Sequence, residues 1–303
     1  MSKIFHIDSC PICGSNSLHK EFPAVDRMVS QETFDVWRCD NCGFRLTQDV
    51  PDEKEIDRYY ESTDYISHSD TEKGLMNRLY HLARNMMLTA KAGHVTRATG
   101  LRQGWLLDIG SGTGYFAHLM TEWGWTVRAI EKNAQARQFA QDHFGLKSDG
   151  DEAFATLDDH SFDCITLWHV LEHLQPLDEM GNNLHRWLKD EGAVLIAVPN
   201  HLSTDARHYG ADWAAWDVPR HLWHFTPATM QLFAEKHGFK IIKTIPMPLD
   251  GFYVSMLSEQ HLNHKRSFLR GLWQGCCAWV SSWGHKERSS SLIYVLKKKD
   301  INT

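Results

Sequence analysis

The sequence has no apolar run that approaches the roughly 20 residues needed to cross a bilayer, and no apolar leader segment at its start. It also has no excess of positive charge, since 32 lysines and arginines stand against 38 aspartates and glutamates and the net charge is −6. A broad phosphate-binding surface needs clustered cations, so nucleic acid is not an expected partner. Repeats and low-complexity tracts are absent as well. We therefore expect a folded, cytoplasmic protein of ordinary globular composition.

Cysteine is scarce, with seven in 303 residues, and the spacing of four of them is not that of a disulfide framework. Cys10 and Cys13 form one C-x-x-C pair, Cys39 and Cys42 form a second, and a glycine follows each pair. Four thiolates in a tetrahedron select zinc, and a closed four-cysteine site leaves no open coordination position. The pattern resembles a zinc ribbon. It predicts a structural Zn²⁺ site in a small domain over residues 1–50.

A glycine-rich turn is predicted after the segment W-L-L-D-I at residues 105–109. The apolar run indicates a buried strand, the following G-S-G-T-G indicates a sharp turn, and a helix is expected from about Tyr115. Such a turn presents free backbone N–H groups to a nucleotide-like ligand. The acid before the first glycine, Asp108, would repel a pyrophosphate. The spacing D-x-G-x-G-x-G therefore favours a ligand with a positive amine and no phosphate, such as S-adenosylmethionine.

This segment resembles the first motif of the class I S-adenosylmethionine-dependent methyltransferases. The resemblance implies that Asp108, Gly110, Gly112 and Gly114 line the methionine end of the cofactor. It also implies a Rossmann-like α/β fold, in which seven mostly parallel strands carry helices on both faces.

The next predicted strand, residues 126–131, ends in Glu131 about twenty residues beyond the glycine turn. A ribose-binding carboxylate belongs at this position, because its oxygens can accept hydrogen bonds from both ribose hydroxyls. The alternative is that Glu131 only caps the helix that starts near Ala134.

The segment over residues 162–174 resembles the fourth-strand motif of small-molecule methyltransferases related to the ubiquinone-biosynthesis O-methyltransferases. The resemblance implies that the strand end, with Trp168 and His169, faces the transferable methyl group. His169, Glu172 and His173 also spell H-x-x-E-H, a pattern of some zinc peptidases. Here the first histidine directly follows a strand, which disfavours a peptidase metal site. We expect His169 or His173 to act as a general base, or His169 to be a structural histidine with satisfied hydrogen bonds.

The loop over residues 201–225 follows the fifth predicted strand and carries several tryptophans and histidines. Ligands of open α/β sheets lie beyond the carboxyl ends of the strands, so this loop should border the pocket. We expect Trp216, Arg220 and His221 on the acceptor side, with Arg220 suited to a carboxylate or phosphate and His221 a further catalytic candidate. The alternative is an aromatic plug that stabilises a long loop.

Three regions are predicted along the chain: the zinc ribbon over 1–50, a helical linker or cap over 51–104, and the methyltransferase domain over 105–303. Tyr60, Tyr65 and His68 in the cap are candidates to touch cofactor or substrate, or to anchor the segment on the core. An insertion at about 250–288 contains an amphipathic helix rich in tryptophan. It predicts a buried cap, a homodimer contact or contact with a membrane surface.

The favoured function is methyl transfer to a small molecule: a sugar, a lipid-linked intermediate or a quinone-like metabolite. One alternative is an RNA methyltransferase whose ribbon binds RNA, although residues 1–60 carry no basic tract. Another is a cofactor-binding scaffold without catalysis. The complete D-x-G-x-G-x-G segment and Glu131 argue against a decayed site.

Overall fold

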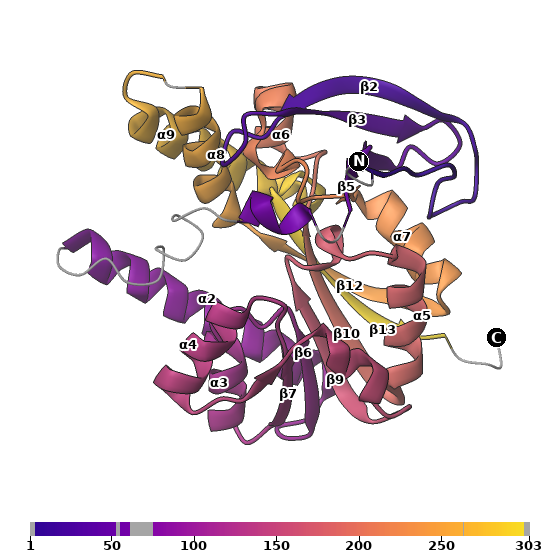
Figure 1. The fold of residues 1–303 in the computed structure, drawn as a ribbon. Helices are drawn as coiled ribbons and strands as arrows, with labels where there is room; N and C mark the ends of the chain where they lie inside the picture. The colour runs from indigo at the N-terminus through magenta and orange to yellow at the C-terminus, as the bar shows by residue number, and fades with distance from the viewer. Residues whose placement is uncertain (1–3, 53–54, 61–74, 263, 300–303) are drawn as a thin grey trace.

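The computed structural model describes residues 4–52, 55–60, 75–262 and 264–299 and is built around one seven-stranded sheet (Figure 1). The strand order is β12-β13-β10-β9-β6-β7-β8. Strands β10, β9, β6, β7 and β8 are parallel to one another, whereas β13 is antiparallel to both β10 and β12. The strands are β6 (Trp105–Ile109), β7 (Thr126–Ile130), β8 (Ser148–Asp149), β9 (Phe162–Trp168), β10 (Leu188–Pro199), β12 (Phe239–Met247) and β13 (Ser291–Lys298). The predicted α/β fold with a mostly parallel sheet is confirmed.

Helices cover both faces of this sheet, because neighbouring strand residues point to opposite sides. Leu106 and Leu195 pack with α2 and α3 in one buried cluster, whereas Leu107 and Ile196 pack with α5 and α7 in another. The helices are α2 (Leu75–Thr99), α3 (Tyr115–Glu122), α4 (Ala134–Phe144), α5 (Leu177–Trp187) and α7 (Pro227–Lys236). Short 3₁₀ turns lie at η1 (Ile56–Tyr60), η2 (Asp151–Thr156) and η3 (Leu171–His173).

Local signals explain where these helices begin and end. Asn133 accepts hydrogen bonds from two backbone N–H groups at the start of α4. Thr226 and Thr229 form a capping box before α7, and Gly238 follows that helix with φ +76°. Strand β10 begins at Leu188, directly after α5, and residues 189–192 form an irregularity in its pairing with β9.

The zinc-ribbon segment forms a second sheet, whose order is β11-β4-β3-β2. Its edge strand β11 comes from the predicted loop over 201–225, since Trp223 pairs with Leu46 and His224 with Arg45. The sheet therefore crosses the predicted boundary at residue 50. The strands are β2 (Leu18–Val25), β3 (Thr33–Cys39), β4 (Arg45–Gln48) and β11 (Trp223–His224), with β1 (Ile4–Phe5) paired to β5 (Val50–Pro51).

The remaining loop and insertion are largely helical. The 201–225 segment contains α6 (Thr204–Tyr209), η4 (Gly210–Asp212) and η5 (Ala214–Trp216). The insertion is a helical hairpin of α8 (Asp250–His261) and α9 (Ser267–Gly284), followed by η6 (Lys286–Arg288), and it projects beside α6 (Figure 1). Among the helices within the described ranges, none is long and apolar enough to cross a membrane.

Candidate functional site

The glycine turn after β6 leaves one glycine facing open space. Gly112 has φ +54°, and a Cβ placed on it would have no atom within 4 Å. A Cβ on Gly110, with φ +68°, would lie 2.3 Å from Val170 Cγ2, and one on Gly114 would lie 2.8 Å from the Cβ of Ala140. Gly110 and Gly114 are therefore required by packing, and Gly112 is the position where a ligand can approach the backbone.

Glu131 closes the turn from the next strand. Its Oε2 accepts a hydrogen bond from the Gly112 N–H at 2.7 Å, and its Oε1 accepts one from the Asn133 N–H at 2.8 Å. Burial raises the pKa of this carboxyl above its usual value. Each oxygen keeps a second lone pair for a ligand hydroxyl. Glu131 thus supports the start of α4, as one interpretation held, and still suits a ribose.

Asp108 is a buried acid whose charge is poorly compensated. It is 1% exposed and accepts a hydrogen bond from the Thr166 hydroxyl at 2.7 Å. Burial raises its pKa to about 7, although Thr166 and the positive charge of Lys91 oppose this. Ser111 Oγ and Trp168 Nε1 are also buried and lack a hydrogen-bond partner within the described part of the chain. A ligand that brings a positive amine and several polar atoms fits these unmet groups.

His169 lies directly after β9 with φ +59°, between two carboxylates. Its Nε2 is 3.0 Å from Asp250 Oδ2, and its Nδ1 is 3.5 Å from Glu172 Oε1. Burial alone would lower the pKa of His169, but the interactions with Asp250 and Glu172 outweigh it and raise the pKa to about 9. The imidazole is therefore a cation near neutral pH, suited to stabilising negative charge rather than to accepting a proton.

His173, His221 and Glu172 form a buried polar cluster beside His169. The Nδ1 of His173 is 2.9 Å from the Arg220 carbonyl oxygen, and the Nδ1 of His221 is 2.9 Å from that of Ala215. The Nδ1 of His173 then acts as a donor, which leaves its Nε2 with a free lone pair, whereas the Nε2 of His221 lies 3.8 Å from Asp217 Oδ2. Burial and the neighbouring His221 lower the pKa of His173 to about 4, so it is neutral at pH 7.

Glu172 completes this cluster with a side chain that is 1% exposed. No residue in the described ranges hydrogen-bonds to either of its carboxylate oxygens. One ligand atom from each of Glu172, His173 and His221 lies within 4.8 Å of the others, so the three groups could also reach one divalent cation. Tyr60 points its hydroxyl to within 3.1 Å of His173 Nδ1. Tyr65 and His68, the other candidates from the cap, lie outside the described residues.

A family model described as a methyltransferase domain matches residues 82–244, which is more than half of the chain. The chain belongs to the class I methyltransferases. Comparison with curated proteins gives no significant match.

Solved methyltransferase structures share the fold. A putative sarcosine dimethylglycine methyltransferase from Galdieria sulphuraria is 14% identical, with 74% of this chain and 88% of that chain covered and a TM-score of 0.52. A SAM-dependent methyltransferase from Archaeoglobus fulgidus is 20% identical, with 71% of this chain and 94% of that chain covered and a TM-score of 0.49. A third structure is phosphoethanolamine N-methyltransferase 2 from Haemonchus contortus in complex with S-adenosylmethionine. It is 19% identical, with 70% of this chain and 53% of that chain covered and a TM-score of 0.47.

In this methyltransferase, Arg220 is occupied by the protein itself, contrary to its expected role on the acceptor side. Its guanidinium donates to both oxygens of Asp217, to Asp26 at 3.0 Å and to the Tyr59 carbonyl oxygen at 2.8 Å. The side chain is 4% exposed, so a substrate anion would have to displace a carboxylate. Arg220 is therefore a positioning residue that ties the ribbon, η1 and the loop together.

Trp216 is also a core residue of the loop. Its ring contacts Phe22 of the ribbon, Trp213 and His224, and its Nε1 donates to the Gly210 carbonyl oxygen at 2.8 Å. The ring is 5% exposed. The aromatic-plug interpretation of the loop therefore describes Trp216, whereas His221 lies in the polar cluster with Glu172 and His173.

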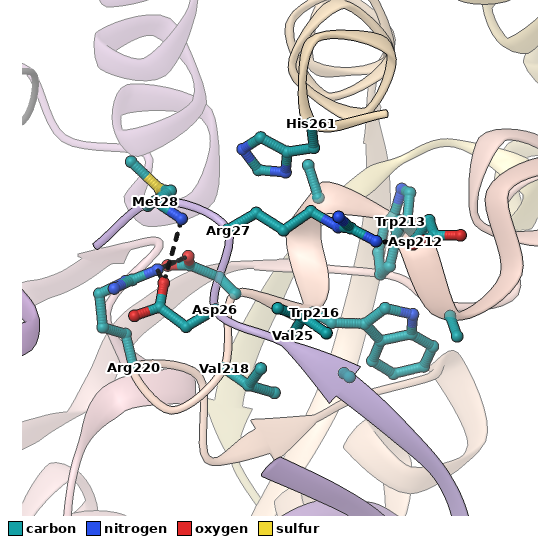
Figure 2. A pocket seen from close by; sticks show the side chains of 14 residues that line it. Val25, Asp26, Arg27, Met28, Asp212, Trp213, Trp216, Val218, Arg220 and His261 are labelled. Atoms are coloured by element: carbon teal, nitrogen blue, oxygen red, sulfur yellow. Dashed lines mark hydrogen bonds and ion pairs between the residues drawn. The ribbon is translucent and has the colours of Figure 1, made fainter. Parts of the chain in front are cut away.

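A small pocket lies between the turn after β2 and the loop, as Figure 2 shows. Asp26 and Arg27 line it from the ribbon, and Asp212, Trp216 and Arg220 line it from the loop. Its two arginines are already paired with acids of the protein, Arg27 with Asp212 and Arg220 with Asp26. The pocket is therefore a seam between ribbon and loop and does not include the glycine turn.

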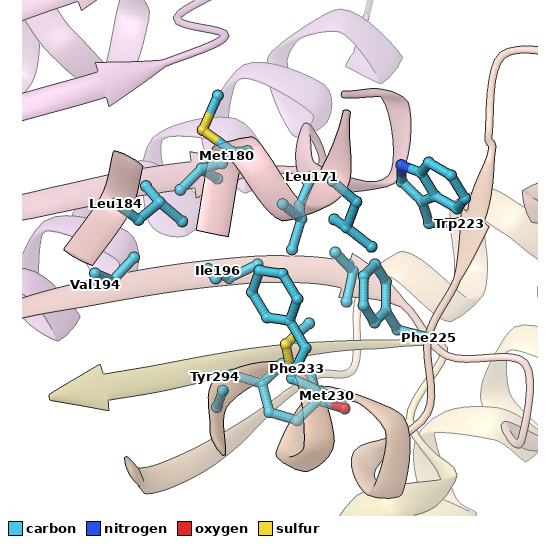
Figure 3. Close-up of a cluster of buried hydrophobic side chains, with 14 of the residues drawn as sticks. Leu171, Met180, Leu184, Val194, Ile196, Trp223, Phe225, Met230, Phe233 and Tyr294 are labelled. Carbon is cyan, nitrogen blue, oxygen red and sulfur yellow. The ribbon is translucent and has the colours of Figure 1, made fainter. Parts of the chain in front are cut away.

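An apolar core packs against the polar cluster of Glu172, His173 and His221. Leu171, next to Glu172, packs into the large buried cluster with Trp223 and Phe225 of the loop, as Figure 3 shows. Phe44 of the ribbon stacks on Trp223 at 6.3 Å between ring centres. Ribbon, loop and sheet thus share one core, which fixes the acceptor side of the site.

The four ribbon cysteines come together as predicted. The sulfur atoms of Cys10 and Cys42 are 3.6 Å apart, as are those of Cys13 and Cys39. All four lie within 4.8 Å of one another. Sulfurs about 2.3 Å from one tetrahedral zinc ion would be roughly 3.8 Å apart, so this cage fits Zn²⁺.

Several residues of the site were missed in the sequence. Lys91 on α2 places its ammonium 4.7 Å from the centre of the Trp168 ring, and burial lowers its pKa. Asp250 begins α8, yet it binds His169 across 81 positions of the chain. Neither residue lies in a recognisable motif. The hydroxyl of Thr166 was within the predicted strand β9, and the parallel pairing of β6 with β9 would have placed it beside Asp108.

Proposed function

We propose that this methyltransferase transfers a methyl group from S-adenosylmethionine to a small-molecule acceptor: a sugar, a lipid-linked intermediate or a quinone-like metabolite. The observation that carries the proposal is the acceptor cluster, which we define as the half-buried His169 and His173 with the buried Glu172 and His221, and which lies beyond β9 and next to the glycine turn. When bound, S-adenosylmethionine supplies an electrophilic methyl group. The protein supplies alignment, exclusion of water and a proton acceptor.

Different residues of the site would bind different parts of the cofactor. Asp108 and Lys91 determine the charge at the position where the amine of the methionine end would bind. Gly112 leaves its backbone open to the ligand, and Glu131 would accept hydrogen bonds from the ribose hydroxyls. Trp168 lies at the strand end, where its ring contacts the Lys91 ammonium and helps to position that charge beside the cofactor site.

The proton acceptor in this proposal is Nε2 of His173. Its Nδ1 proton is fixed on the Arg220 carbonyl oxygen, so the lone pair of Nε2 is oriented before the acceptor binds. Glu172 stabilises the resulting cation, and the His169 cation, held by Asp250, stabilises negative charge on the acceptor. The small-molecule assignment is supported by the net charge of −6, which disfavours a nucleic-acid acceptor.

We also propose that Cys10, Cys13, Cys39 and Cys42 hold a structural Zn²⁺ ion. The distances between the sulfurs and the closed four-thiolate donor set support this assignment. The ion would hold together the two turns that carry the C-x-x-C pairs.

The test begins with calorimetric titration of S-adenosylmethionine into the folded, zinc-loaded wild type and Asp108→Ala. Micromolar binding that is lost in the variant supports the cofactor site, and absence of binding to the wild type overturns it. Labelled cofactor and an acceptor panel then test His173→Asn, which should retain cofactor affinity and lose about 100-fold or more in turnover.

Two further outcomes would reassign the site. A requirement for added Mg²⁺ or Mn²⁺ would assign Glu172, His173 and His221 to a metal ion instead of a proton acceptor. Steeply salt-dependent binding of RNA would favour a nucleic-acid substrate.

A further inference from the structure

Helix α9 exposes its large apolar side chains and buries its small residues. Trp273 and Trp283 are 72% and 70% exposed. The buried positions of the helix are Gly271, Gly275, Ala278 and Ser282. The exposed apolar residues recur at helical spacing along one face, the α9 face: Phe268, Leu269, Leu272, Trp273, Trp279, Val280 and Trp283.

This inversion is built into the contact with α8. A Cβ added to Gly271 would lie 2.5 Å from Met256 Cα, and one added to Gly275 would lie 2.8 Å from Phe252 Cα. The two helix backbones therefore approach closely through glycine, as helices do in lipid, where small residues form the interface. A helix that packs on a core in water buries its large residues instead. The hairpin thus has the arrangement of a pair of helices adapted to an apolar surrounding.

Positive charge flanks the α9 face at both ends. Lys265 and Arg266 precede the helix, Lys286 and Arg288 follow it, and no acidic residue occurs from Ser267 to Gly284. Arg270 is paired with Glu259 of α8 at 2.8 Å, so its charge is compensated. Glu287 is the acidic residue among the flanking cations, and it lies 3.2 Å from His285. The flanks are positive although the whole chain is negative.

This charge pattern distinguishes two possible partners of the α9 face, a second copy of the helix and an anionic surface. Two copies of α9 packed antiparallel would bring Lys265 and Arg266 of one copy against Lys286 and Arg288 of the other. Like charges would then meet at both ends of the contact. An anionic surface compensates both ends at once, and tryptophan is enriched at the boundary between lipid headgroups and acyl chains.

We propose that the α9 face binds the surface of a bilayer that contains anionic lipid. The helix lies in the plane of the interface, with its tryptophans among the headgroups and acyl chains, and its flanking cations contact lipid phosphates. The proposal does not rest on methyl transfer. Asp250 is the first residue of α8 and holds His169, so the same hairpin joins the lipid-facing helix to the acceptor cluster.

The test is co-sedimentation of the full-length, zinc-loaded protein with vesicles. Vesicles of phosphatidylcholine alone are compared with vesicles that contain about one-third phosphatidylglycerol. We expect binding to the anionic vesicles, weakened by salt, and a loss of roughly fivefold in partitioning for each charge removed by Lys265→Gln and Lys286→Gln. The double variant Trp273→Gln/Trp283→Gln should lose about tenfold or more.

The matched control is Trp105→Gln, which removes a tryptophan that is 53% exposed on β6, away from the hairpin. It should bind vesicles like the wild type, and circular dichroism of every variant confirms folding. Equal binding by the wild type and the Trp273→Gln/Trp283→Gln variant, or no binding by the wild type to anionic vesicles, overturns the proposal. A dimer in analytical ultracentrifugation that this double variant dissociates would assign the face to a second copy and overturn it too.

Discussion

Replacing Asp108 by Asn should stabilise the protein without ligand while abolishing cofactor binding. The carboxylate is 1% exposed, and burial raises its pKa from 3.8 to about 7. At pH 8 the charged form then costs the folded state up to about 4 kcal/mol, because each pKa unit corresponds to about 1.36 kcal/mol. Asn removes the charge and keeps an acceptor for the Thr166 hydroxyl. Since its amide must also be buried, we expect a net gain of roughly 1–3 kcal/mol.

The pH dependence follows from the direction of this shift. Well below pH 3.8 the carboxyl is protonated in both the folded and unfolded states, so it costs nothing. As the pH rises towards 7 the unfolded state loses this proton first, and the folded state loses stability through this group. The advantage of Asp108→Asn in free energy of unfolding should therefore be largest at pH 8 and shrink towards pH 5. Urea unfolding at both pH values measures it.

Cofactor binding should show the opposite preference. A cationic amine favours the ionised carboxylate, so the affinity of the wild type for S-adenosylmethionine should rise between pH 6 and pH 8, with proton release seen as a dependence of the binding enthalpy on buffer. The reasoning is refuted if Asp108→Asn is no more stable than the wild type at pH 8, or if it still binds the cofactor with unchanged affinity.

Five further substitutions test the turn, the ribbon contact and the four-cysteine cage. Gly110→Ala should lose about 1–3 kcal/mol of stability through its clash with Val170, whereas Gly112→Ala should lose mainly cofactor affinity; thermal melts and titrations separate them. Arg220→Met should cost about 3–5 kcal/mol in urea unfolding by leaving buried Asp26 unpaired, against less than about 1 kcal/mol for the half-exposed Arg27→Met. Cys39→Ser should lower metal content and turnover more than cofactor affinity; unchanged zinc content would contradict the cage.

The cofactor half of the site could be predicted because its signals are local. An apolar run, an acid and alternate glycines within ten residues determine β6, the turn and the start of α3. Glu131 follows at the end of the next parallel strand, and strand pairing alone brings it to the Gly112 N–H. The cysteine pairs carry the same kind of information, since each pair and its glycine form one short turn.

The acceptor half could be predicted only in part, because its contacts join distant segments. His169, His173 and His221 were identified from composition and position, but the pKa values of His169 and His173 depend on partners elsewhere in the chain. Asp250, which makes His169 a cation, lies in the insertion, where only the helical periodicity of α9 was informative. The pairing of β11 with β4 likewise joins segments about 180 residues apart and has no local pattern.

Arg220 connects the ribbon to the proposed acceptor site through its contacts with both. An arginine in an aromatic loop resembles an anchor for a substrate anion, yet its partners are Asp26 of the ribbon and Tyr59 of η1. The same residue offers its carbonyl oxygen to Nδ1 of His173 and so determines which nitrogen of that imidazole is free. A change in the ribbon that releases Asp26 would thus alter the orientation of the proposed proton acceptor while Asp108, Gly112 and Glu131 stay in place. The four-cysteine cage would in this sense be coupled to the proposed acceptor site, although it lies outside the seven-stranded sheet.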